Sequence, residues 1–590
     1  MDNGQWIMEM IRRFFAAAAL TIMAASAMAA EISVAADSSI ADALKKAREM
    51  RRLNKTAPGE VITINLAPTT YRLYEPITLR TEDHDLVIQG NGKTAVSGGM
   101  KIENWKQENG LWTADIPDFK GRPMIIRQLW VNGKKADKAR DVSDFEKMSR
   151  IRCQDKQNQI LWVPAQAVRK IMNGDSTAFT VQPPEMVLHE MWSVAYLRIK
   201  SIAIHGDSAA VRFMQPEAKL QATHPWPNVM TGEHASPFYI TGSKQLLDQP
   251  GEWFYDRRQG KIYYMPRQGE SIATAEAEIP VLETLVNVEG NTDNIVKNVS
   301  FEGITFCHTT WIRPELYGHV PLQAGMFLTE AYKLRPQMER EDNHKLDNQG
   351  WLGKAKAAII INGGESINFN KCIFTHLGGN GIDYNYACKN GKTENCTFTD
   401  IAMNAYVCGS FSPASLETHI VYDPKDSREV CQGNSISKCT INNIGNEDWG
   451  CCAITAGYVA EQKITDNVIT DVPYSAISLG WGWNRHKSCM HDNYVAGNKI
   501  TFYGKHCYDC AGIYTLGNQP GTIIEKNSVT QIYKPSYVHD PNHWFYLYTD
   551  EGSSNITVRN NHTEAEKFLK NACGPNNVWE NNGPEVEIKN

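Results

Sequence analysis

The sequence predicts an all-β protein built around a right-handed parallel β-helix, and three observations lead to this prediction. In the C-terminal half a short pattern recurs, in which Cys or Asn stands at one position, usually with an apolar residue two positions later. The flanking residues alternate between apolar and polar with a period of two, which is typical of strands and argues against a helical solenoid. The repeated residues are 24 to 43 positions apart, as expected for stacked turns with loops of different length. They are Cys372, Cys396, Cys439, Asn467, Asn498, Asn527 and Asn561.

A second strand aligns across the same turns. Six dipeptides occupy one register, namely Gly381-Ile382, Ala405-Tyr406, Ala453-Ile454, Ala476-Ile477, Gly512-Ile513 and Tyr546-Leu547. Because side chains alternate across a strand, the next residue in each turn would face outward. This predicts a mostly polar and aromatic floor for an extended ligand, made of Asp383, Val407, Thr455, Ser478, Tyr514 and Tyr548.

The N-terminal half is organised differently. Residues 30–97 are expected to form a cap and the first β-helix strands, with a helix over 38–53 and strands over 61–66 and 70–79. Such a cap would cover the open end of the solenoid, which otherwise exposes a sheet edge. Residues 98–285 lack the repeat and carry strand-and-turn patterns, so they predict an inserted antiparallel β-sandwich-like domain. The main β-helix with its groove would occupy 286–590, with 307–356 as a long loop over the groove.

Residues 1–29 have the pattern of a cleaved signal peptide. Arg12-Arg13 precede a short apolar run over 14–23, and Ala27-Met28-Ala29 supplies small residues before a cleavage point. An anchor helix is the alternative, but the run is short and ends in small residues. We therefore expect a periplasmic or secreted protein without a lipid anchor. No other apolar run approaches the roughly 20 residues of a spanning helix, so no membrane span is expected in the mature chain.

Composition limits the function further. The chain of 590 residues has 60 Lys+Arg and 66 Asp+Glu, a net charge of −6, which argues against a sequence-independent nucleic-acid binder. Hydrophobic residues make up 42% and charged residues 21%, which excludes wholesale disorder. The 14 Cys are distributed as buried small residues in a stack, with one or two disulfides left open. No cofactor or metal motif is found, and a monomer is expected.

Carboxylates and tryptophans cluster where loops leave the aligned strand. The clusters lie at 445–450, 480–483, 508–512 and 542–552, so they can converge on one face. A carboxylic acid that protonates the leaving oxygen and a second carboxylate are the groups that cleave glycosidic bonds. Trp offers a flat apolar face to a sugar ring. Substrate contacts are therefore expected from Glu447, Asp448, Trp481, Trp483, His543, Tyr514 and Tyr548.

Asp509 and Asp550 are the candidates for the acid/base and the nucleophile or water-activating base, without a decision on which is which. Glu551 competes for the second role, and its structural alternative is a loop carboxylate paired with Arg559. In the predicted register, Asp509 lies over His543, and the two Asp leave opposite ends of the strand in neighbouring turns. They can meet only if loops bend over the groove.

Several motifs resemble one family of enzymes. They are Gln128-Leu-Trp-Val-Asn-Gly, Glu252-Trp-Phe-Tyr-Asp, Gly480-Trp-Gly-Trp, Gly512-Ile-Tyr-Thr-Leu-Gly517 and Asp550-Glu-Gly-Ser-Ser554. Together they resemble glycoside hydrolase family 141 and, more weakly, family 120. The resemblance implies an exported glycosidase with an inserted β domain, which acts on plant cell-wall-type glycans as an α-L-fucosidase or xylanase does. It also implies catalytic carboxylates at Asp509 and at the Asp550-Glu551 pair.

Two other functions remain open from the sequence. A polysaccharide lyase acting on a pectin-like uronide would need a basic residue or Tyr as base and often Ca²⁺, and Arg485, His486 and Lys487 follow the Trp pair. A non-catalytic carbohydrate-binding solenoid would use the same strip without cleaving a bond. The acidic and Trp-rich face favours hydrolysis over both.

Overall fold

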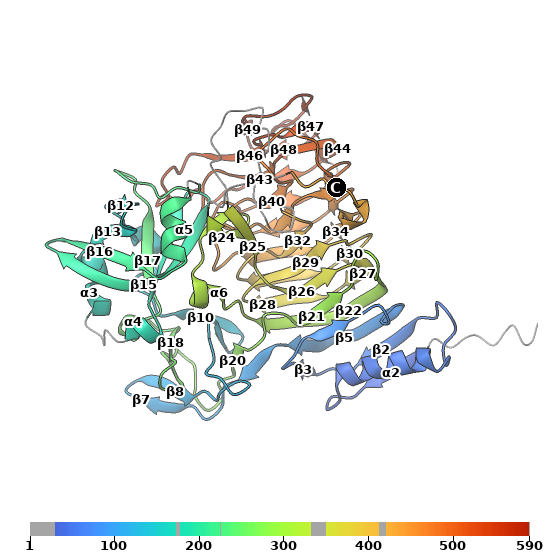
Figure 1. The fold of residues 1–590 in the computed structure, drawn as a ribbon, viewed down its shortest axis with the longest axis horizontal. Helices are drawn as coiled ribbons and strands as arrows, with labels where there is room; N and C mark the ends of the chain where they lie inside the picture. Colours follow the sequence, from blue (N-terminus) through green and yellow to red (C-terminus); the bar gives the residue numbers. More distant parts are fainter. Residues whose placement is uncertain (1–29, 173–177, 225, 332–349, 412–420, 589–590) are drawn as a thin grey trace, which may run out of the picture.

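The protein is a tall stack of parallel strands with a second β domain beside it (Figure 1). The computed structural model describes residues 30–172, 178–224, 226–331, 350–411 and 421–588. The expected signal peptide over 1–29 lies outside the described residues. The parallel β-helix is thus confirmed as the main architecture.

Three parallel stacks form the faces of the coil, and long strands β5 and β22 continue from the first into the second. The first contains β1 (Ala30–Val34), β2 (Ile62–Leu66), β5 (Leu86–Ser97), β22 (Val296–Thr309), β27 (Gly364–Asn370), β30 (Lys392–Glu394), β34 (Ser435–Ser437), β38 (Lys463–Thr465), β41 (Tyr494–Ala496), β44 (Asn518–Glu525), β47 (Ser554–Arg559) and β50 (Val578–Glu580). The second adds β3 (Thr70–Arg72), β28 (Ile373–Leu377), β31 (Thr397–Ile401), β35 (Thr440–Ile444), β39 (Val468–Thr470), β42 (Lys499–Ile500), β45 (Ser528–Val529) and β48 (His562–Thr563).

The third stack is the aligned strand of the sequence pattern, and we call it the groove stack. It contains β4 (Ile77–Leu79), β21 (Val286–Glu289), β26 (Ala357–Asn362), β29 (Asn380–Tyr386), β32 (Tyr406–Cys408), β36 (Ile454–Ala456), β40 (Ile477–Leu479), β43 (Cys510–Thr515), β46 (Trp544–Thr549) and β49 (Phe568–Lys570). Its predicted register is confirmed, because Ile382, Tyr406, Ile454, Ile477, Ile513 and Leu547 pair in sequence from turn to turn.

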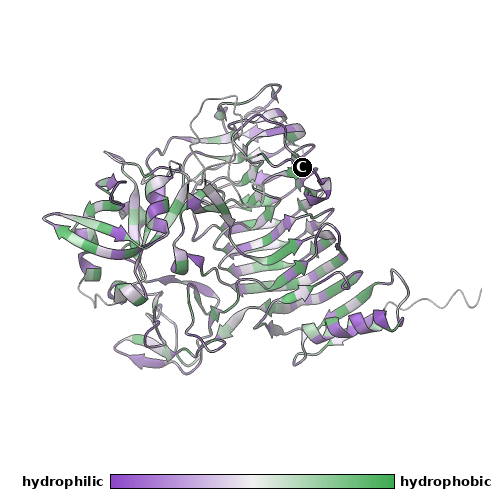
Figure 2. Cartoon of the chain, in the orientation of Figure 1, coloured by the Kyte–Doolittle hydropathy of each residue, from purple (hydrophilic) through white to green (hydrophobic). Residues whose placement is uncertain are grey.

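The coil interior is filled by identical side chains stacked between turns. Phe374 stacks on Phe398 with ring centroids 4.7 Å apart, and Phe301 on Phe369 at 5.2 Å. Alternation along each strand sends every second residue inward, so each turn buries its apolar side chains only against its neighbours. Figure 2 shows this alternation as hydrophobic and hydrophilic bands along the stacked strands.

Asparagines at the predicted corner form a continuous buried ladder. The side-chain amide of Asn467 donates to the Oδ1 of Asn498 at 2.9 Å, and Asn498 donates in the same way to Asn527. Asn527 donates to Asn561, and each Oδ1 also accepts the backbone N–H of the turn before. The ladder satisfies polar groups that the tight corner would otherwise bury without partners.

Cysteines occupy the same corner in the earlier turns. The Sγ of Cys439 accepts the backbone N–H of Cys396, and Cys439 in turn donates its own N–H to Asn467. All 14 cysteines are free thiols and most are buried. They therefore act as small side chains in the stack, as the sequence predicts, and not as disulfide partners.

The N-terminal cap is helix α2 (Ile40–Arg52), close to the expected 38–53. Ser39 caps it by accepting the N–H of Asp42, and its buried face is Ile40, Ala43, Leu44 and Ala47. Its other face is hydrophilic in Figure 2. The strand expected over 70–79 is two strands, β3 and β4, because the chain turns a corner of the coil between them.

The strands between β5 and β21 pair antiparallel, except that β10 runs parallel to β18. One sheet contains β6 (Gly99–Lys101), β7 (Lys106–Glu108), β8 (Leu111–Asp115), β9 (Leu129–Val131), β10 (Lys134–Lys138), β18 (Glu252–Asp256), β19 (Lys261–Tyr264) and β20 (Ala277–Pro280). The other contains β11 (Ser149–Arg150), β12 (Cys153–Asp155), β13 (Ile160–Pro164), β14 (Glu185–Glu190), β15 (Ser193–His205), β16 (Ser208–Phe213) and β17 (Pro237–Thr241). Short helices α3 (Gln166–Met172), α4 (Ala178–Val181) and α5 (Glu217–Thr223) accompany the second sheet.

The segment 307–356 is more structured than the long loop that the sequence predicts. Within its described part it holds helix α6 (Arg313–Tyr317) and a small antiparallel sheet, β23 (Pro321–Gln323), β24 (Met326–Ala331) and β25 (Gly350–Lys354). Lys354 at the end of β25 pairs with Asp383 of the groove stack at 2.8 Å. The sheet thus packs against the coil through a partly buried ion pair.

Candidate active site

Asp509 and Asp550 stand at opposite ends of neighbouring strands of the groove stack. Asp509 directly precedes β43, and its N–H donates to the carbonyl of His543 at 2.6 Å. Asp550 directly follows β46, and its N–H donates to the carbonyl of Thr515 at 3.0 Å. The predicted register of both residues therefore agrees with the backbone pairing of β43 and β46.

Tyr548 connects the two carboxylates. Burial raises its pKa, and the charges of Asp509 and Asp550 raise it further, together with hydrogen bonds to both carboxylates. Burial and the charge of Asp550 likewise raise the pKa of Tyr514, which stands opposite Tyr548 in the preceding turn. One phenol thus lies within reach of both acids, although they leave opposite strand ends.

Asp550 is held on both of its oxygens. Its Oδ2 accepts the hydroxyl of Tyr514 at 2.5 Å, and its Oδ1 accepts the amide of Asn571 at 2.8 Å. The residue is only 8% exposed. Burial raises its pKa, the charge of Asp509 adds to the shift, and the bonds from Tyr514 and Asn571 oppose it. A carboxyl in this setting favours its neutral form more than an exposed Asp does.

Asp509 is more open and has a basic partner. Its Oδ1 lies 3.1 Å from the Nε2 of His543, and its side chain is 20% exposed against 40% for His543. The hydrogen bond to Asp509 raises the pKa of His543 and is the largest effect. Burial lowers this pKa, and the charge of Asp509 raises it by less than the hydrogen bond does. The ring of His543 also packs edge-on against Phe545 at 5.1 Å.

An aromatic cluster surrounds the pair. Tyr514, Tyr548 and Phe545 pack together with Ala511 and Leu516, and the half-buried Trp483 lies against them. The predicted floor residues Tyr514 and Tyr548 are buried, at 2% and 3% exposure. Their hydroxyls therefore face the carboxylates inside the protein. The sequence analysis instead expected these two residues to form part of an open strip.

The two tryptophans expected as sugar platforms have different environments. Trp481 is 1% exposed and packs edge-on against Phe411 and Trp483, with centroids 4.9 and 5.1 Å away. Trp483 is half-buried at the edge of the aromatic cluster. The geometry therefore makes Trp483 the better placed of the two to meet a ligand, with Trp481 packed behind it.

Glu551 is exposed, and its backbone N–H bonds to the carboxyl of Asp550. Arg559, the ion-pair partner suggested for it from the sequence, binds Glu525 instead, at 2.7 Å. Glu525 stands directly opposite Arg559 in the pairing of β44 and β47, which explains this ion pair.

Glu447 faces the inserted domain, where it forms an ion pair with Lys135 and accepts the side-chain amide of Gln128 at 2.9 Å. Asp448 is 2% exposed and lies 3.1 Å from the Nε2 of the buried His319, which precedes β23. All these partners come from segments more than a hundred residues away, and the contacts of Glu447 link the inserted domain to the coil.

Asn571 is a site residue that the sequence analysis missed. It follows β49, and because β46 and β49 pair with Thr549 opposite Lys570, Asn571 lies over Asp550. The last turn lacks the apolar repeat of the earlier turns, so its strands are hard to recognise in the sequence. Asn571 could have been found only by extending the repeat by one more turn beyond Asp550.

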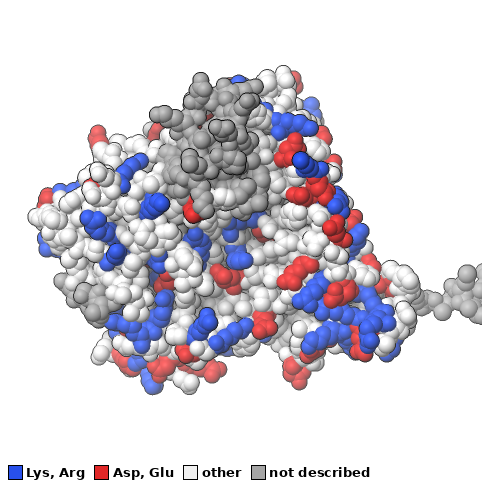
Figure 3. All heavy atoms as spheres, viewed as in Figure 1, with Lys and Arg blue, Asp and Glu red and all other residues white. Residues whose placement is uncertain are grey.

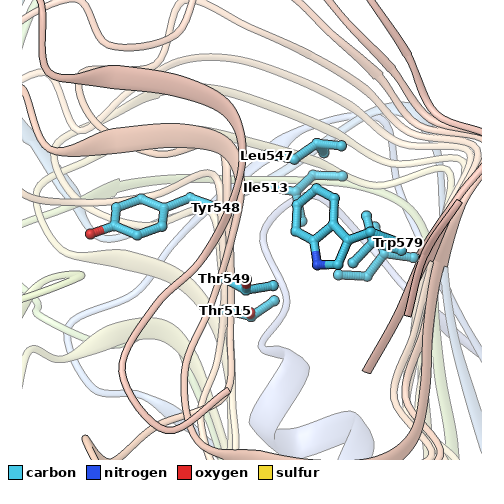
Figure 4. Close-up of a pocket in the computed structure, with 8 residues that line it drawn as sticks. Ile513, Thr515, Leu547, Tyr548, Thr549 and Trp579 are labelled. Carbon is cyan, nitrogen blue, oxygen red and sulfur yellow. The ribbon is translucent and has the colours of Figure 1, made fainter. Parts of the chain in front are cut away.

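The coil interior near the site is closed. Ile513, Leu547, Thr515, Thr549 and Trp579 enclose a narrow gap at the last turns (Figure 4). In the same view the ring of Tyr548 points away from this gap, to the other side of its strand. The carboxylates near Tyr548 therefore lie on the outer side of this strand, and not in the gap.

Two further findings concern the described residues only. Within them, no group of three or more His, Cys, Asp or Glu side chains is arranged to hold a metal ion. None of their helices combines the length and the apolar character that crossing a bilayer requires. On the face shown in Figure 3, acidic and basic side chains are interspersed.

The chain is similar to known proteins over most of its length. The profile of the GH141 insertion domain matches residues 109–267. A solved structure named as a glycoside hydrolase is 51% identical, with 95% of this chain and 97% of that chain covered and a TM-score of 0.91. Weaker likenesses are XylC in complex with xylose (11% identity, 92% and 70% covered, TM-score 0.45) and a tailspike protein of E. coli bacteriophage HK620 with a pentasaccharide (14%, 50% and 44%, 0.29). No curated protein matches in sequence.

A β-helix with paired carboxylates and this relative define the class: the protein is a glycoside hydrolase. It belongs to glycoside hydrolase family 141, as its inserted domain and the 51% identical structure show. The predicted resemblance and the predicted enzyme class are therefore confirmed.

Proposed function

We propose that this glycoside hydrolase cleaves plant cell-wall-type polysaccharide or oligosaccharide, with an α-L-fucosidase-like or xylan-like substrate, and that Asp509 and Asp550 catalyse the cleavage. The observation that carries the proposal is that Asp509 and Asp550 flank the paired strands β43 and β46, with Tyr548 near both carboxylates. Two carboxyl groups whose environments differ are the arrangement that glycoside hydrolysis needs. The substrate class follows from the activities known in family 141.

We assign the proton donor to Asp550. Burial and the charge of Asp509 raise its pKa, so Asp550 holds a proton at a pH where an exposed Asp has lost it. The more open Asp509 lies 3.1 Å from His543, whose pKa this contact raises. Asp509 is then the nucleophile or the base that activates water, and Tyr548 orients the two acids toward the same bond.

The proposal includes export. The pattern of residues 1–29, with Arg12-Arg13, a short apolar run and Ala27-Met28-Ala29, supports a cleaved signal peptide and a periplasmic or secreted enzyme. Mass spectrometry of the protein recovered from its native host tests this directly. A mature chain that begins near Ala30 is expected, and an intact N-terminus in the cytoplasm would contradict export.

His543→Gln is expected to remove a fall in kcat/KM on the alkaline side of the pH profile. The hydrogen bond to Asp509 raises the pKa of His543, so the ring keeps its positive charge to higher pH than an ordinary His does. Wild type loses this charge, and the activity that depends on it, as pH rises through the pKa of His543, whereas the variant has no such ionisation to lose. A pH–rate profile of both proteins measures the difference.

His491→Gln is the matched control, because His491 pairs with Asp492 at 2.8 Å on the outer surface. It should leave the profile unchanged. The same alkaline fall in His543→Gln as in wild type would contradict the role given to His543, whatever the effect on overall rate.

A substrate screen tests the proposed function. Purified protein is incubated with xylan, fucosylated pectin fractions and aryl α-L-fucosides and β-xylosides, and the products are sized and identified. Release of fucose, xylose or xylo-oligosaccharides is expected. Products that absorb in the ultraviolet as unsaturated uronides would indicate a lyase, and no cleavage of any fraction would contradict the proposed substrate class.

A further inference from the structure

The inserted domain reaches the β-helix beside Asp509. Strands β14 and β15 form a hairpin whose two-residue tip is Met191–Trp192, with Glu190 paired to Ser193. The N–H of Tyr508, the residue before Asp509, points to the carbonyl of Met191 at 3.5 Å. The tip packs tightly on the coil, because a Cβ added to Gly450 would lie 3.2 Å from the carbonyl oxygen of Trp192.

Two tryptophans stand together at this tip. The rings of Trp192 and Trp226 are nearly parallel, with an interplanar angle of 13° and centroids 6.1 Å apart, and both residues are only half-buried. The indole N–H of Trp192 donates to the carbonyl of Leu322 at 2.7 Å, which fixes its ring. The segment of Trp226 is tied to the tip, since the N–H of Asn228 lies 3.5 Å from the Sδ of Met191.

A second segment borders the same junction from the coil side. His539, in the loop that leads to His543, bonds to the carbonyl of His234 in the inserted domain at 2.7 Å. Its ring lies 6.1 Å from that of Tyr508. Tyr508 is 4% exposed, and its hydroxyl has no hydrogen-bond partner among the described residues. A buried hydroxyl without a partner costs free energy unless something binds it.

Flat indole faces and an unsatisfied hydroxyl are the groups that bind a sugar ring, through its C–H face and its hydroxyls. Half-buried tryptophans on a hairpin tip that contacts Tyr508, the residue before Asp509, are also costly to leave in water. Figure 1 shows the inserted domain standing beside the turns of β40, β43 and β46, so a glycan on the groove stack would run along this junction.

We propose that Trp192 and Trp226 form a sugar-binding subsite between the inserted domain and the β-helix, which holds an uncharged sugar residue of the glycan next to the bond that is cleaved. This inference rests on the proposed function, since the position of the subsite is defined by Asp509. It gives the inserted domain a direct part in choosing longer substrates over single sugars.

Trp226→Ala tests the subsite by comparing substrates of two lengths. On a short oligosaccharide that wild type cleaves, the variant is expected to lose about ten-fold in kcat/KM, mainly through KM, because one stacking face is removed. On an aryl monosaccharide glycoside, which does not reach the subsite, its activity should remain that of wild type. Trp226→Phe keeps an aromatic face and should recover most of the loss.

Trp162→Ala is the matched control. Trp162 is a half-buried Trp of the same domain that packs against His205 on strand β15, and it should change neither activity. Thermal unfolding of each variant separates misfolding from lost binding, and Trp192→Phe serves if Trp226→Ala does not fold. Equal activity of Trp226→Ala and wild type on the oligosaccharide, or an equal loss on both substrates, would overturn the subsite.

Binding to xylo-oligosaccharides in an Asp550→Asn background keeps the two proposals separate. If wild type cleaves no glycan, the proposed function fails. Calorimetry in the Asp550→Asn background then tests glycan binding at the subsite without any need for cleavage. Weaker binding upon Trp226→Ala supports the subsite. Unchanged binding upon Trp226→Ala contradicts the subsite. So does a result in which this surface binds another protein but no glycan.

Discussion

Asp509→Asn and Asp550→Asn are each expected to lower kcat on a glycan by roughly 10²–10⁴-fold. Asn keeps the shape of the side chain but neither donates a carboxylic proton nor attacks as an anion. Rates on the best substrate from the screen measure the loss. Near wild-type activity in both variants would remove the assignment of the site.

The leaving group distinguishes the two roles. An aryl glycoside with a very acidic phenol departs without protonation, so Asp550→Asn should retain much of its rate on that substrate while Asp509→Asn should not. The reverse pattern would exchange the roles that we assign to the two carboxylates. Glu551→Gln is the matched comparison, because Glu551 is the adjacent exposed acid and should cost far less.

Stability measurements support the interpretation of these variants. Because the pKa of Asp550 is raised on folding, the unfolded chain releases this proton first as pH rises above the ordinary Asp value of about 3.9, and folded stability falls. Asp550→Asn removes that penalty. The variant should be at least as stable as wild type at neutral pH, with the difference vanishing below about pH 4. Lower stability at neutral pH would contradict a buried, destabilising charge.

Asn527→Ala is expected to lower the free energy of unfolding by about 3 kcal/mol, since it leaves several buried groups without partners. Its side chain donates to Asn561 and to the carbonyls of Val495 and Glu525. Its Oδ1 accepts both the backbone and the side-chain N–H of Asn498. Urea unfolding measures the loss, which should appear as a lower midpoint.

Asn370→Ala is the control for the ladder. Among the described residues, the side chain of Asn370 makes only one bond, an exposed one that its Oδ1 accepts from Asn395 at 3.1 Å, so its removal should cost less than about 0.5 kcal/mol. Similar losses in both variants would show that the buried ladder contributes no more than a surface pair, which would contradict the structural role of Asn527.

Much of the β-helix could be predicted from residues alone. The corner positions of Asn467 and Asn498, the aligned strand and the placement of Asp509 over His543 all appear in the structure as the repeat predicts. Each turn pairs with the next through backbone hydrogen bonds, so residues at equal repeat positions become neighbours in space. A local pattern is enough to find such contacts.

Other parts of the site depend on contacts that no repeat encodes. Glu447, which is expected to contact a ligand, pairs with Lys135 of the inserted domain, and the expected open floor at Tyr514 is buried. The bridge that Tyr548 makes between two acids at opposite strand ends was also outside the reach of the register argument.

By itself, the sequence determined the coil, its register and the two carboxylates that this register brings to neighbouring turns, because these follow from a pattern repeated along the chain. Only the tertiary structure decided which side chains are buried, which acids face the inserted domain and where Trp192 and Trp226 stand. Those outcomes come from packing between segments far apart in the chain, such as Met191 against Tyr508, and packing of that kind leaves no periodic signal.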